Sequence, residues 1–421
     1  MTSEVLILNK RAMVLGADSA VTTSGGDHPR YSKSANKIFE ISRNGNVAAM
    51  IFGAAAVDLL PWEVALKEFR THLGNTSFPS LDDYGKALFE YLSGNNKLFD
   101  SDLRKGWVNS QFDEAVKVAL KEVDTEIFNK EIPLQVRSEL WISEVGRLNG
   151  MIEERGVLES LSENNLNEFL SEVAIGPWIV RVADQLREAQ IDAVDAGTLA
   201  ILGHKIRYSY PHLILFGGTG LVIAGYGDDQ IFPAYSQYEV YGHIADELAY
   251  KRIKNFEVSH TSSAMIQPLA QSSMISMFTE GFSGPLEKII QEQGESTFQT
   301  IFEKLKERGI EISGVVTQAV IEECKTSFMQ GWKLKNWEQN FHPLLNVLQS
   351  LSIQEMAHLA ESLLGLESLK ERVTSPSESI GGPIDVVAIT KSEGLVWIRR
   401  KHYFDPSLNM RYAARLERSF N

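Results

Sequence analysis

The sequence predicts an α+β fold, because short apolar strand-like runs alternate in blocks with amphipathic helical segments. Strands are expected in the first sixty residues, then helices, then strands from about residue 213, helices again, and a last strand pair near residue 390. This order fits two stacked sheets between two helical layers. The chain has 421 residues, of which 43% are hydrophobic, so it can fill a normal globular core.

The first sixty residues predict four short strands. Apolar runs at 5–8, 13–19, 37–41 and 48–58 are rich in Val, Ile, Leu and Ala, and polar or glycine-containing turns separate them. The segment 22–34 between the second and third runs contains two glycines, a proline and several polar residues, so it is expected to form a loop.

Helices are predicted where apolar residues recur every three or four positions. The first follows Pro61, which suits a first helical turn, and a second spans 81–92. Further helices are expected at 263–282 and 286–307. Ser352 and Glu355 form a capping-box pattern ahead of another. Strands are expected at 213–216, 221–225 and 231–241. The segment 217–220 (Gly-Gly-Thr-Gly) is interpreted as a connection between strands. A phosphate-binding loop would need a Lys-Ser/Thr ending and a helix after it, and neither is present.

The chain is expected to form one main domain in two parts, 1–96 and 206–421, separated by an insertion at 97–205. The insertion is rich in charge and has helical periodicity. It contains Trp107, Trp141 and Trp178, so a small core of its own is expected there.

Composition excludes several classes of function. The formal net charge of −14 disfavours binding to nucleic acid or to an anionic membrane, both of which need a basic face. The single cysteine, Cys324, excludes an internal disulfide framework and a CxxC metal site. The longest apolar run, 47–57, is too short to span a bilayer, and no signal-peptide pattern is present. A cytoplasmic protein without metal or cofactor is therefore expected.

Thr2 is the residue most informative about chemistry. If Met1 is removed, Thr2 carries a hydroxyl nucleophile and a free α-amino group that can act as its base. Asp18 and Lys37 follow at the end of the second strand and before the third, where they could form an ion pair. The alternative is that Thr2 is an ordinary second residue and that the two charges are solvated strand ends.

Taken together, these residues resemble the proteasome β-subunits and related N-terminal-nucleophile hydrolases, as a bacterial-type member with large helical insertions. Asp18 stands in Gly-Ala-Asp-Ser, Lys37 precedes Ile-Phe-Glu-Ile, and Gly53 ends an Ala-rich strand. Segments 352–360 and 381–398 also resemble the family's penultimate helix and closing hairpin. The resemblance implies a four-layer α/β/β/α sandwich.

The resemblance also implies roles for individual residues. Thr2 would be the nucleophile, Asp18 and Lys37 its supporting pair, and the Gly53 amide the oxyanion donor. The implied substrate site is an extended-peptide edge with an apolar pocket, formed by Val21, Thr22, Ala35, Phe39, Ile51 and Ala55. The family's supporting Ser-Gly and Asp-x-x-Ser-Gly motifs are only partly matched, by Ser262, Ser263, Glu378 and Ser379.

The function expected from these residues is a threonine-type hydrolase of amide or peptide bonds. One alternative is a catalytically silent scaffold or binding subunit, and another is an amidohydrolase whose groove the insertion closes around a small amide. A peptide or small-amide substrate and a homo-oligomer are expected, with no nucleic-acid or membrane partner. Whether an ATP-driven unfoldase feeds the protein is left open.

Overall fold

The computed structural model describes residues 2–23, 30–43, 45–100, 218–244, 247–310, 314–374 and 381–405, with scattered residues in 102–184 and 408–414. The chain divides into two compact units. The first comprises Met1–Ile38, Gln230–Ala234 and Glu257–Asn421, and the second Phe39–Asp229 and Tyr235–Phe256.

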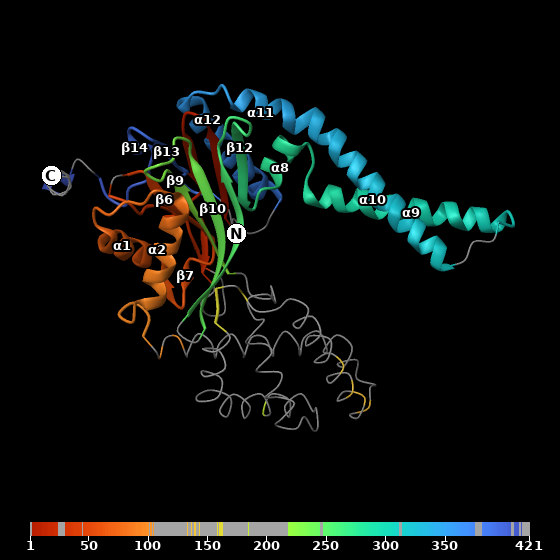
Figure 1. Cartoon of the computed structure of the whole chain (residues 1–421), viewed down its shortest axis with the longest axis horizontal. Helices are drawn as coiled ribbons and strands as arrows, with labels where there is room; N and C mark the ends of the chain where they lie inside the picture. The colour runs from red at the N-terminus through yellow and green to blue at the C-terminus, as the bar shows by residue number, and fades with distance from the viewer. Residues whose placement is uncertain are drawn as a thin grey trace. The chain divides into compact units, whose positions relative to one another are not determined.

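The first unit is built on an antiparallel sheet with strand order β12-β1-β2-β13-β14 (Figure 1). Its strands are β1 Ser3–Asn9, β2 Met13–Ala17, β12 Ala264–Ala270, β13 Asp385–Thr390 and β14 Gly394–Arg399. A short pair, β3 Val21–Thr23 and β4 Arg30–Ser32, lies within the segment that the sequence predicted as a loop. The β1–β2 and β13–β14 hairpins agree with the sequence prediction.

Asn9 fixes the turn between β1 and β2. Its side-chain oxygen accepts hydrogen bonds from the amides of Arg11 (2.9 Å) and Ala12 (3.3 Å). Its side-chain nitrogen donates to the carbonyls of Leu348 and Leu351, each at 3.0 Å. The turn is therefore tied to the helical layer as well as to its own hairpin, which sets the register that brings the ends of β1 and β2 together.

One face of this sheet is covered by helices α8 Ser273–Glu280, α11 His342–Leu348 and α12 Ile353–Thr374 (Figure 1). The core contains Val5 and Ile7 from β1, Val14 from β2 and the buried stripe of α12. Because strand side chains alternate, Thr2, Glu4 and Leu6 belong to the opposite face. A Cβ on Gly16 would lie 2.9 Å from Leu364 Cδ1, so glycine allows α12 to approach β2 closely.

The capping box of α12 is confirmed. The Ser352 amide donates to Glu355 Oε2 at 2.7 Å, and the Glu355 amide donates to Ser352 Oγ at 3.3 Å. The buried stripe is also the predicted one: Met356, Ala357, Ala360, Leu363 and Leu364 are buried. A local sequence pattern thus located both the start of this helix and the face that it buries.

The helix predicted at 263–282 is wrong. The segment contains strand β12, which pairs with β1 from Asn9↔Ala264 to Ser3↔Ala270, and only then helix α8. Pro268 gives the physical reason, because it lacks an amide donor and would break a helix interior but is tolerated in an edge strand. β12 is the edge strand of this sheet.

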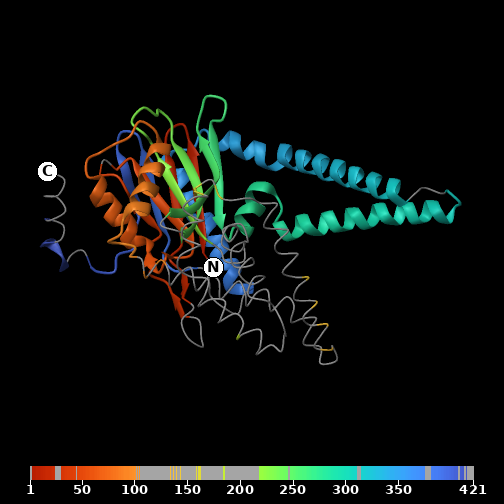
Figure 2. The ribbon, with the colours of Figure 1, turned by 60° about the horizontal axis from the view of Figure 1, so that its bottom comes forward.

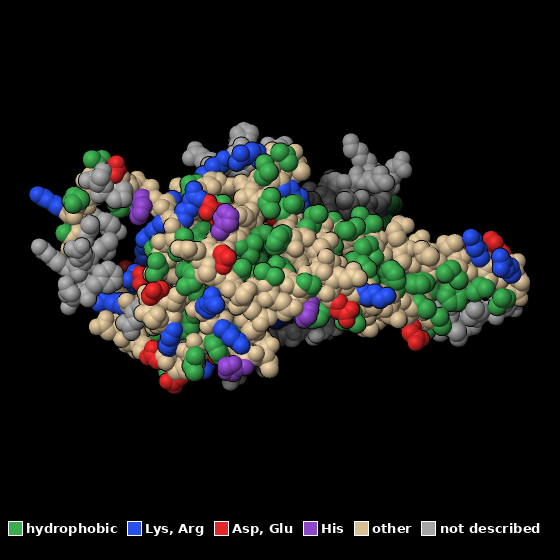
Figure 3. Space-filling view, turned by 90° about the horizontal axis from the view of Figure 1, so that it is seen from above, with side chains coloured by type: hydrophobic (Ala, Val, Ile, Leu, Met, Phe, Trp, Pro, Cys, Tyr) green, Lys and Arg blue, Asp and Glu red, His purple; other side chains and the backbone are tan. Residues whose placement is uncertain are grey.

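Helices α9 Gly284–Glu307 and α10 Gly314–Asn336 form a helical hairpin, an arm that extends from the first unit (Figure 2). A π-helical turn, η1 Trp337–Phe341, joins α10 to α11 just before Pro343, whose missing amide cannot continue the α-helical pattern. Residues of α9 are not buried, and apolar side chains lie along the arm surface (Figure 3). Ile289 is 54% exposed and Ile301 48%.

The second unit contains a sheet with strand order β11-β10-β9-β6-β5. Its elements are β5 Ile38–Glu40, β6 Val47–Gly53, β7 Ala56–Val57, β8 Leu60–Pro61, α1 Trp62–Leu73, α2 Leu81–Gly94, β9 Thr219–Gly225, β10 Ala234–Ile244 and β11 Glu247–Glu257. β6 pairs antiparallel with β9, and the Trp62 indole donates to Thr219 Oγ1 at 2.8 Å, which ties α1 to the sheet. The Gly-rich run before residue 221 thus leads into a strand, as predicted.

The predicted α+β class is confirmed, and the structure shows that the paired strands are antiparallel. Most of the insertion predicted at 97–205 lies outside the described residues, so its core remains a prediction. No helix among the described residues is long and apolar enough to cross a membrane.

Candidate active site

The ends of β1 and β2 bring Thr2 and Asp18 into one small region. The hairpin register pairs Glu4 with Ala17, so the next residues, Ser3 and Asp18, also face each other. The Asp18 amide donates to the Ser3 carbonyl at 3.1 Å, and the Ser3 amide donates to Asp18 Oδ1 at 3.2 Å. The position of Asp18 beside the start of β1 therefore follows from the length of the hairpin.

Asp18 accepts hydrogen bonds from three different parts of the first unit. Besides the Ser3 amide, the Gly381 amide donates to Asp18 Oδ2 at 2.8 Å, and the Lys37 ammonium donates to Oδ1. Gly381 comes from the segment between α12 and β13, and Lys37 directly precedes β5. Asp18 thereby joins three segments that are far apart in the sequence. The role of the Gly381 amide was not predicted from the sequence.

The three residues of the site are largely shielded from solvent. Thr2 is 7% exposed, Asp18 1% and Lys37 3%. A buried ammonium needs a compensating negative charge, because its transfer from water is otherwise costly. The Asp18 carboxylate supplies that charge, so the expectation that these two charges form an ion pair is confirmed, and the alternative of two solvated strand-end charges is excluded.

A second carboxyl group, that of Glu4, contacts the same ammonium. Glu4 Oε1 lies 3.1 Å from Lys37 Nζ, and the side chain is fully buried. Burial raises the pKa of Glu4 from its usual 4.5 to about 7, and the nearby Asp18 charge adds to this, whereas Lys37 and the Thr2 hydroxyl lower it. Sequence analysis missed Glu4; the available signal was an acidic residue two positions after Thr2 in an otherwise apolar strand.

The polar groups at the start of β1 have few partners. Among the described residues, the Thr2 and Ser3 hydroxyls are buried without a hydrogen bond of normal geometry. The Thr2 carbonyl accepts a hydrogen bond from the Gln271 amide at 3.0 Å, which holds the backbone in place. Buried polar atoms are nearly always satisfied in proteins, so an unsatisfied hydroxyl beside an ion pair suggests a group kept available for chemistry.

The other predicted catalytic residues lie elsewhere. Gly53 ends β6 in the second unit, and its φ of +79° is a backbone conformation that favours glycine. The role of its amide as oxyanion donor stays a prediction. Ser262 and Ser263 precede Ala264, which pairs with Asn9, so they lie at the opposite end of β1 from Thr2. Glu378 and Ser379 fall outside the described residues.

The predicted substrate residues are divided between the two units. In the first, Val21 and Ala35 are partly exposed, and Thr22 lies in β3, where its backbone pairs with Tyr31. The second unit holds the other three, of which Phe39 and Ile51 are buried and Ala55 is exposed. A shared pocket for these residues remains a prediction.

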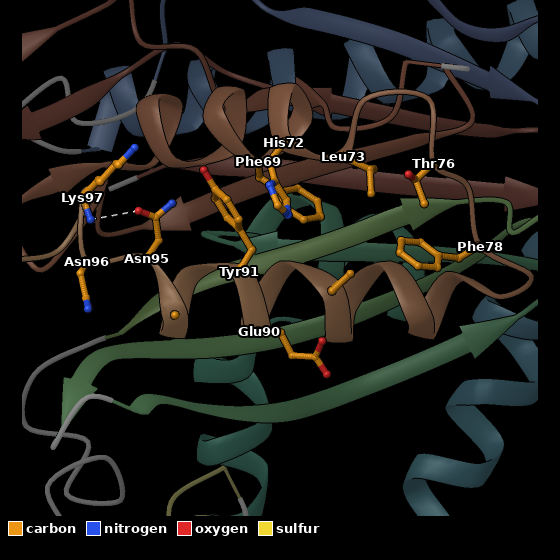
Figure 4. Close-up of a pocket in the computed structure, with 12 residues that line it drawn as sticks. Phe69, His72, Leu73, Thr76, Phe78, Glu90, Tyr91, Asn95, Asn96 and Lys97 are labelled. Atoms are coloured by element: carbon orange, nitrogen blue, oxygen red, sulfur yellow. Dashed lines mark hydrogen bonds between the residues drawn. The ribbon is translucent and has the colours of Figure 1, made fainter.

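The second unit has a cavity of about 780 Å³ at the surface between α1 and α2 (Figure 4). Its lining mixes aromatic and polar side chains from both helices and the residues that follow them, and none is a predicted site residue. The lining residues are Phe69, His72, Leu73, Thr76, Phe78, Ala87, Glu90, Tyr91, Gly94, Asn95, Asn96 and Lys97.

A separate buried polar cluster in the second unit is formed by His243 and Asp58. His243 Nδ1 contacts Asp58 Oδ2, and Nε2 lies 3.2 Å from the Leu92 carbonyl. Both ring nitrogens therefore face oxygen atoms that can accept hydrogen bonds. The described residues contain no group of three or more metal-ligating side chains.

Comparison with known proteins gives limited information. No family model matches the chain, and no curated protein matches it. Solved structures similar to it include Anbu from Hyphomicrobium sp. strain MC1, at 10% identity and a TM-score of 0.31, and the Anbu (Gly-1) mutant from the same strain, at 10% identity and a TM-score of 0.28. Each alignment covers 100% of this chain and 97% of the other. Similarity at this level carries no argument about fold or function.

These comparisons correct the family assignment. The identification of the chain as a proteasome β-subunit-like hydrolase is wrong, because no family model supports it and the similar structures above are of Anbu, at 10% identity. The motifs behind that assignment are only a few residues long and lie at strand ends. Short motifs of this kind recur in many folds, so they do not identify a family. The case for a function must therefore come from the geometry around Thr2.

Proposed function

We propose that the protein hydrolyses amide or peptide bonds with Thr2 as the nucleophile, after removal of Met1. The observation that carries the proposal is the buried cluster in which the Thr2 side chain lies beside Glu4, whose carboxyl contacts the Lys37–Asp18 ion pair. A buried cation shared by two carboxyl groups is costly in stability, and groups of this kind cluster at functional sites.

The proposed reaction uses two groups of one residue. A free α-amino group titrates at about 7.7–8.0, so near neutral pH a useful fraction is unprotonated. It takes the hydroxyl proton while Oγ attacks the substrate carbonyl carbon and forms an ester, and the amine leaving group receives the proton. Water then hydrolyses the ester and regenerates Thr2.

Lys37 supports this chemistry electrostatically. Its positive charge, in a site closed to solvent, favours the neutral form of the α-amine and the developing negative charge on the Thr2 oxygen. Asp18 holds the ammonium in place through three hydrogen bonds of its own. The oxyanion donor proposed for the substrate side is the Gly53 amide. That role belongs to the four-layer α/β/β/α fold, which is part of the proposal.

The first test is the chemical state of the N-terminus. Intact-mass analysis of protein from the native host should show loss of one methionine, and retention of Met1 in every molecule would refute the mechanism. A β-lactone, an electrophile that acylates hydroxyl groups, should then add one acyl group to the N-terminal peptide. Thr2→Ala should abolish the addition, whereas Thr2→Ser should retain it.

The second test is the role of Lys37. Lys37→Met should reduce acylation and peptide hydrolysis to near background, because the groups act as one unit. Lys67→Met is a matched control, since Lys67 is 65% exposed and pairs with Glu63 on the surface of α1. A fluorogenic peptide amide with an apolar residue before the cleaved bond is the first substrate to try. If Lys37→Met keeps the wild-type rate, the site has another role, such as that of a silent scaffold.

The proposal includes a homo-oligomer in the cytoplasm. Apolar side chains exposed along α9 and α10 are compatible with contact between copies. Light scattering at micromolar concentration tests this directly. A monomer that still cleaves peptides would remove the oligomer from the proposal and favour the alternative of a small-amide substrate.

A further inference from the structure

Glu4 is the ionisable group of the site that the proposed reaction does not use. Its side chain is on the same face of β1 as that of Thr2, opposite the face covered by α12. It is fully buried, and Oε2 makes no hydrogen bond among the described residues. Burying a carboxyl group with one oxygen unsatisfied is unfavourable, so its retention beside Thr2 calls for a functional account.

The groups that act on Glu4 come from three elements of the first unit. The ammonium of Lys37, which precedes β5, lies 3.1 Å away, and the Asp18 carboxylate at the end of β2 shares that ammonium. From β1 itself, the Thr2 hydroxyl is close enough to influence Glu4. The neighbouring edge strand β12 carries no charged side chain.

The protonation state of Glu4 therefore sets the net charge around Thr2. With Glu4 neutral, Lys37 and Asp18 balance each other. With Glu4 ionised, two carboxylates surround one ammonium, and the buried site carries one net negative charge. Negative charge opposes the formation of an anion on the Thr2 oxygen, and it also favours the protonated, inactive form of the α-amine.

We propose that Glu4 is a positioning residue that sets the upper pH limit of the Thr2 site: with Glu4 neutral, the Lys37–Asp18 pair is balanced, and with Glu4 ionised, the site carries a net negative charge that opposes the reaction at Thr2. The inference rests on the proposed function. The α-amine must lose its proton and Glu4 must keep its own, so activity should be bell-shaped in pH. Burial raises the pKa of Glu4 to about 7, which places the falling limb near neutral pH.

The test compares the pH dependence of acylation by a β-lactone in the wild type and in Glu4→Gln. Glutamine has the shape of a neutral glutamic acid and cannot ionise, so the variant should lose the alkaline limb. At pH 8, about one molecule in ten keeps Glu4 protonated, so the variant should react about tenfold faster than the wild type. Glu63→Gln, on the surface of α1, is the control and should keep the wild-type profile. A Glu4→Gln profile with the same alkaline limb as the wild type overturns the proposal.

A second measurement on the wild type protects the test against a variant that fails to fold. With glutamate labelled by ¹³C at the side-chain carboxyl, one resonance should titrate near pH 7 and shift its midpoint upward in Lys37→Met, where the counter-charge is gone. A set of glutamates that all titrate near 4–5 would refute the inference without bearing on Thr2. Acylation that persists in Thr2→Ala would instead refute the proposed function.

Discussion

Replacement of Glu4 by glutamine should change the pH dependence of folding stability as well as of activity. In the folded protein the pKa of Glu4 is about 7, against an ordinary value of 4.5. The difference of about 2.5 pH units corresponds to roughly 3 kcal/mol, at 1.36 kcal/mol per unit.

The sign follows from proton binding. Between pH 4.5 and 7 the folded protein keeps the Glu4 proton, whereas the unfolded chain has lost it, so the free energy of unfolding of the wild type falls as pH rises through this range. Glu4→Gln lacks this contribution. The two proteins should be about equally stable at pH 4.5, and the variant should be more stable by roughly 3 kcal/mol at pH 8.

Urea unfolding followed by tryptophan fluorescence measures this difference, because the two proteins differ at a single titrating side chain. Glu63→Gln should differ from the wild type by less than about 1 kcal/mol at both pH values, because its ion pair is on the surface. A Glu4→Gln difference that is the same at pH 4.5 and pH 8 would refute the assignment of Glu4 as a buried group that titrates near neutrality.

Three further predictions concern stability and can be checked by thermal or urea unfolding at pH 7. Asp18→Asn should lower the free energy of unfolding by about 3–5 kcal/mol, because it removes the negative charge that compensates buried Lys37. The control, Asp82→Asn, affects a half-exposed ion pair with Arg252 and should cost less than about 1 kcal/mol. Equal effects of the two substitutions would contradict a buried ion pair at Asp18. Asp58→Asn should cost about 1–3 kcal/mol, because the buried Asp58 carboxylate accepts a hydrogen bond from the His243 amide at 3.1 Å and contacts the His243 ring, and an unchanged free energy of unfolding would contradict this. Ser352→Ala should cost about 1 kcal/mol through loss of the α12 cap, and an unchanged midpoint would show that the cap contributes nothing.

Local patterns in the sequence were sufficient for the hairpins and for the start of α12. The β1–β2 turn at Asn9 and the Ser352–Glu355 box are short-range features whose hydrogen bonds span a few residues. The segment 263–282 shows where such patterns fail, because its apolar residues suit a helix or a strand equally well. Its first part forms strand β12 because it pairs with β1, which lies 255 or more residues earlier in the chain. Pro268 was the one local signal against the helix.

The motifs around Thr2 predicted which charged residues lie together, but they did not predict the family of the chain. They correctly placed Asp18 and Lys37 together, and the length of the β1–β2 hairpin accounts for the position of Asp18. They did not identify a family that the comparisons support. The resemblance of a few short motifs was enough to indicate which charged residues lie together, whereas assignment to a family needs similarity over much more of the chain.

By itself, the sequence determined the α+β class, the antiparallel hairpins, the cap of α12 and the presence of a threonine, an aspartate and a lysine at neighbouring strand ends. Only the tertiary structure decided that Lys37 is buried between two carboxyl groups, and that one of them belongs to Glu4. The physical reason is that the charge state of a carboxyl group depends on its burial and on the charges near it. For Glu4, both depend on residues that are distant in the sequence and that folding brings to the start of β1.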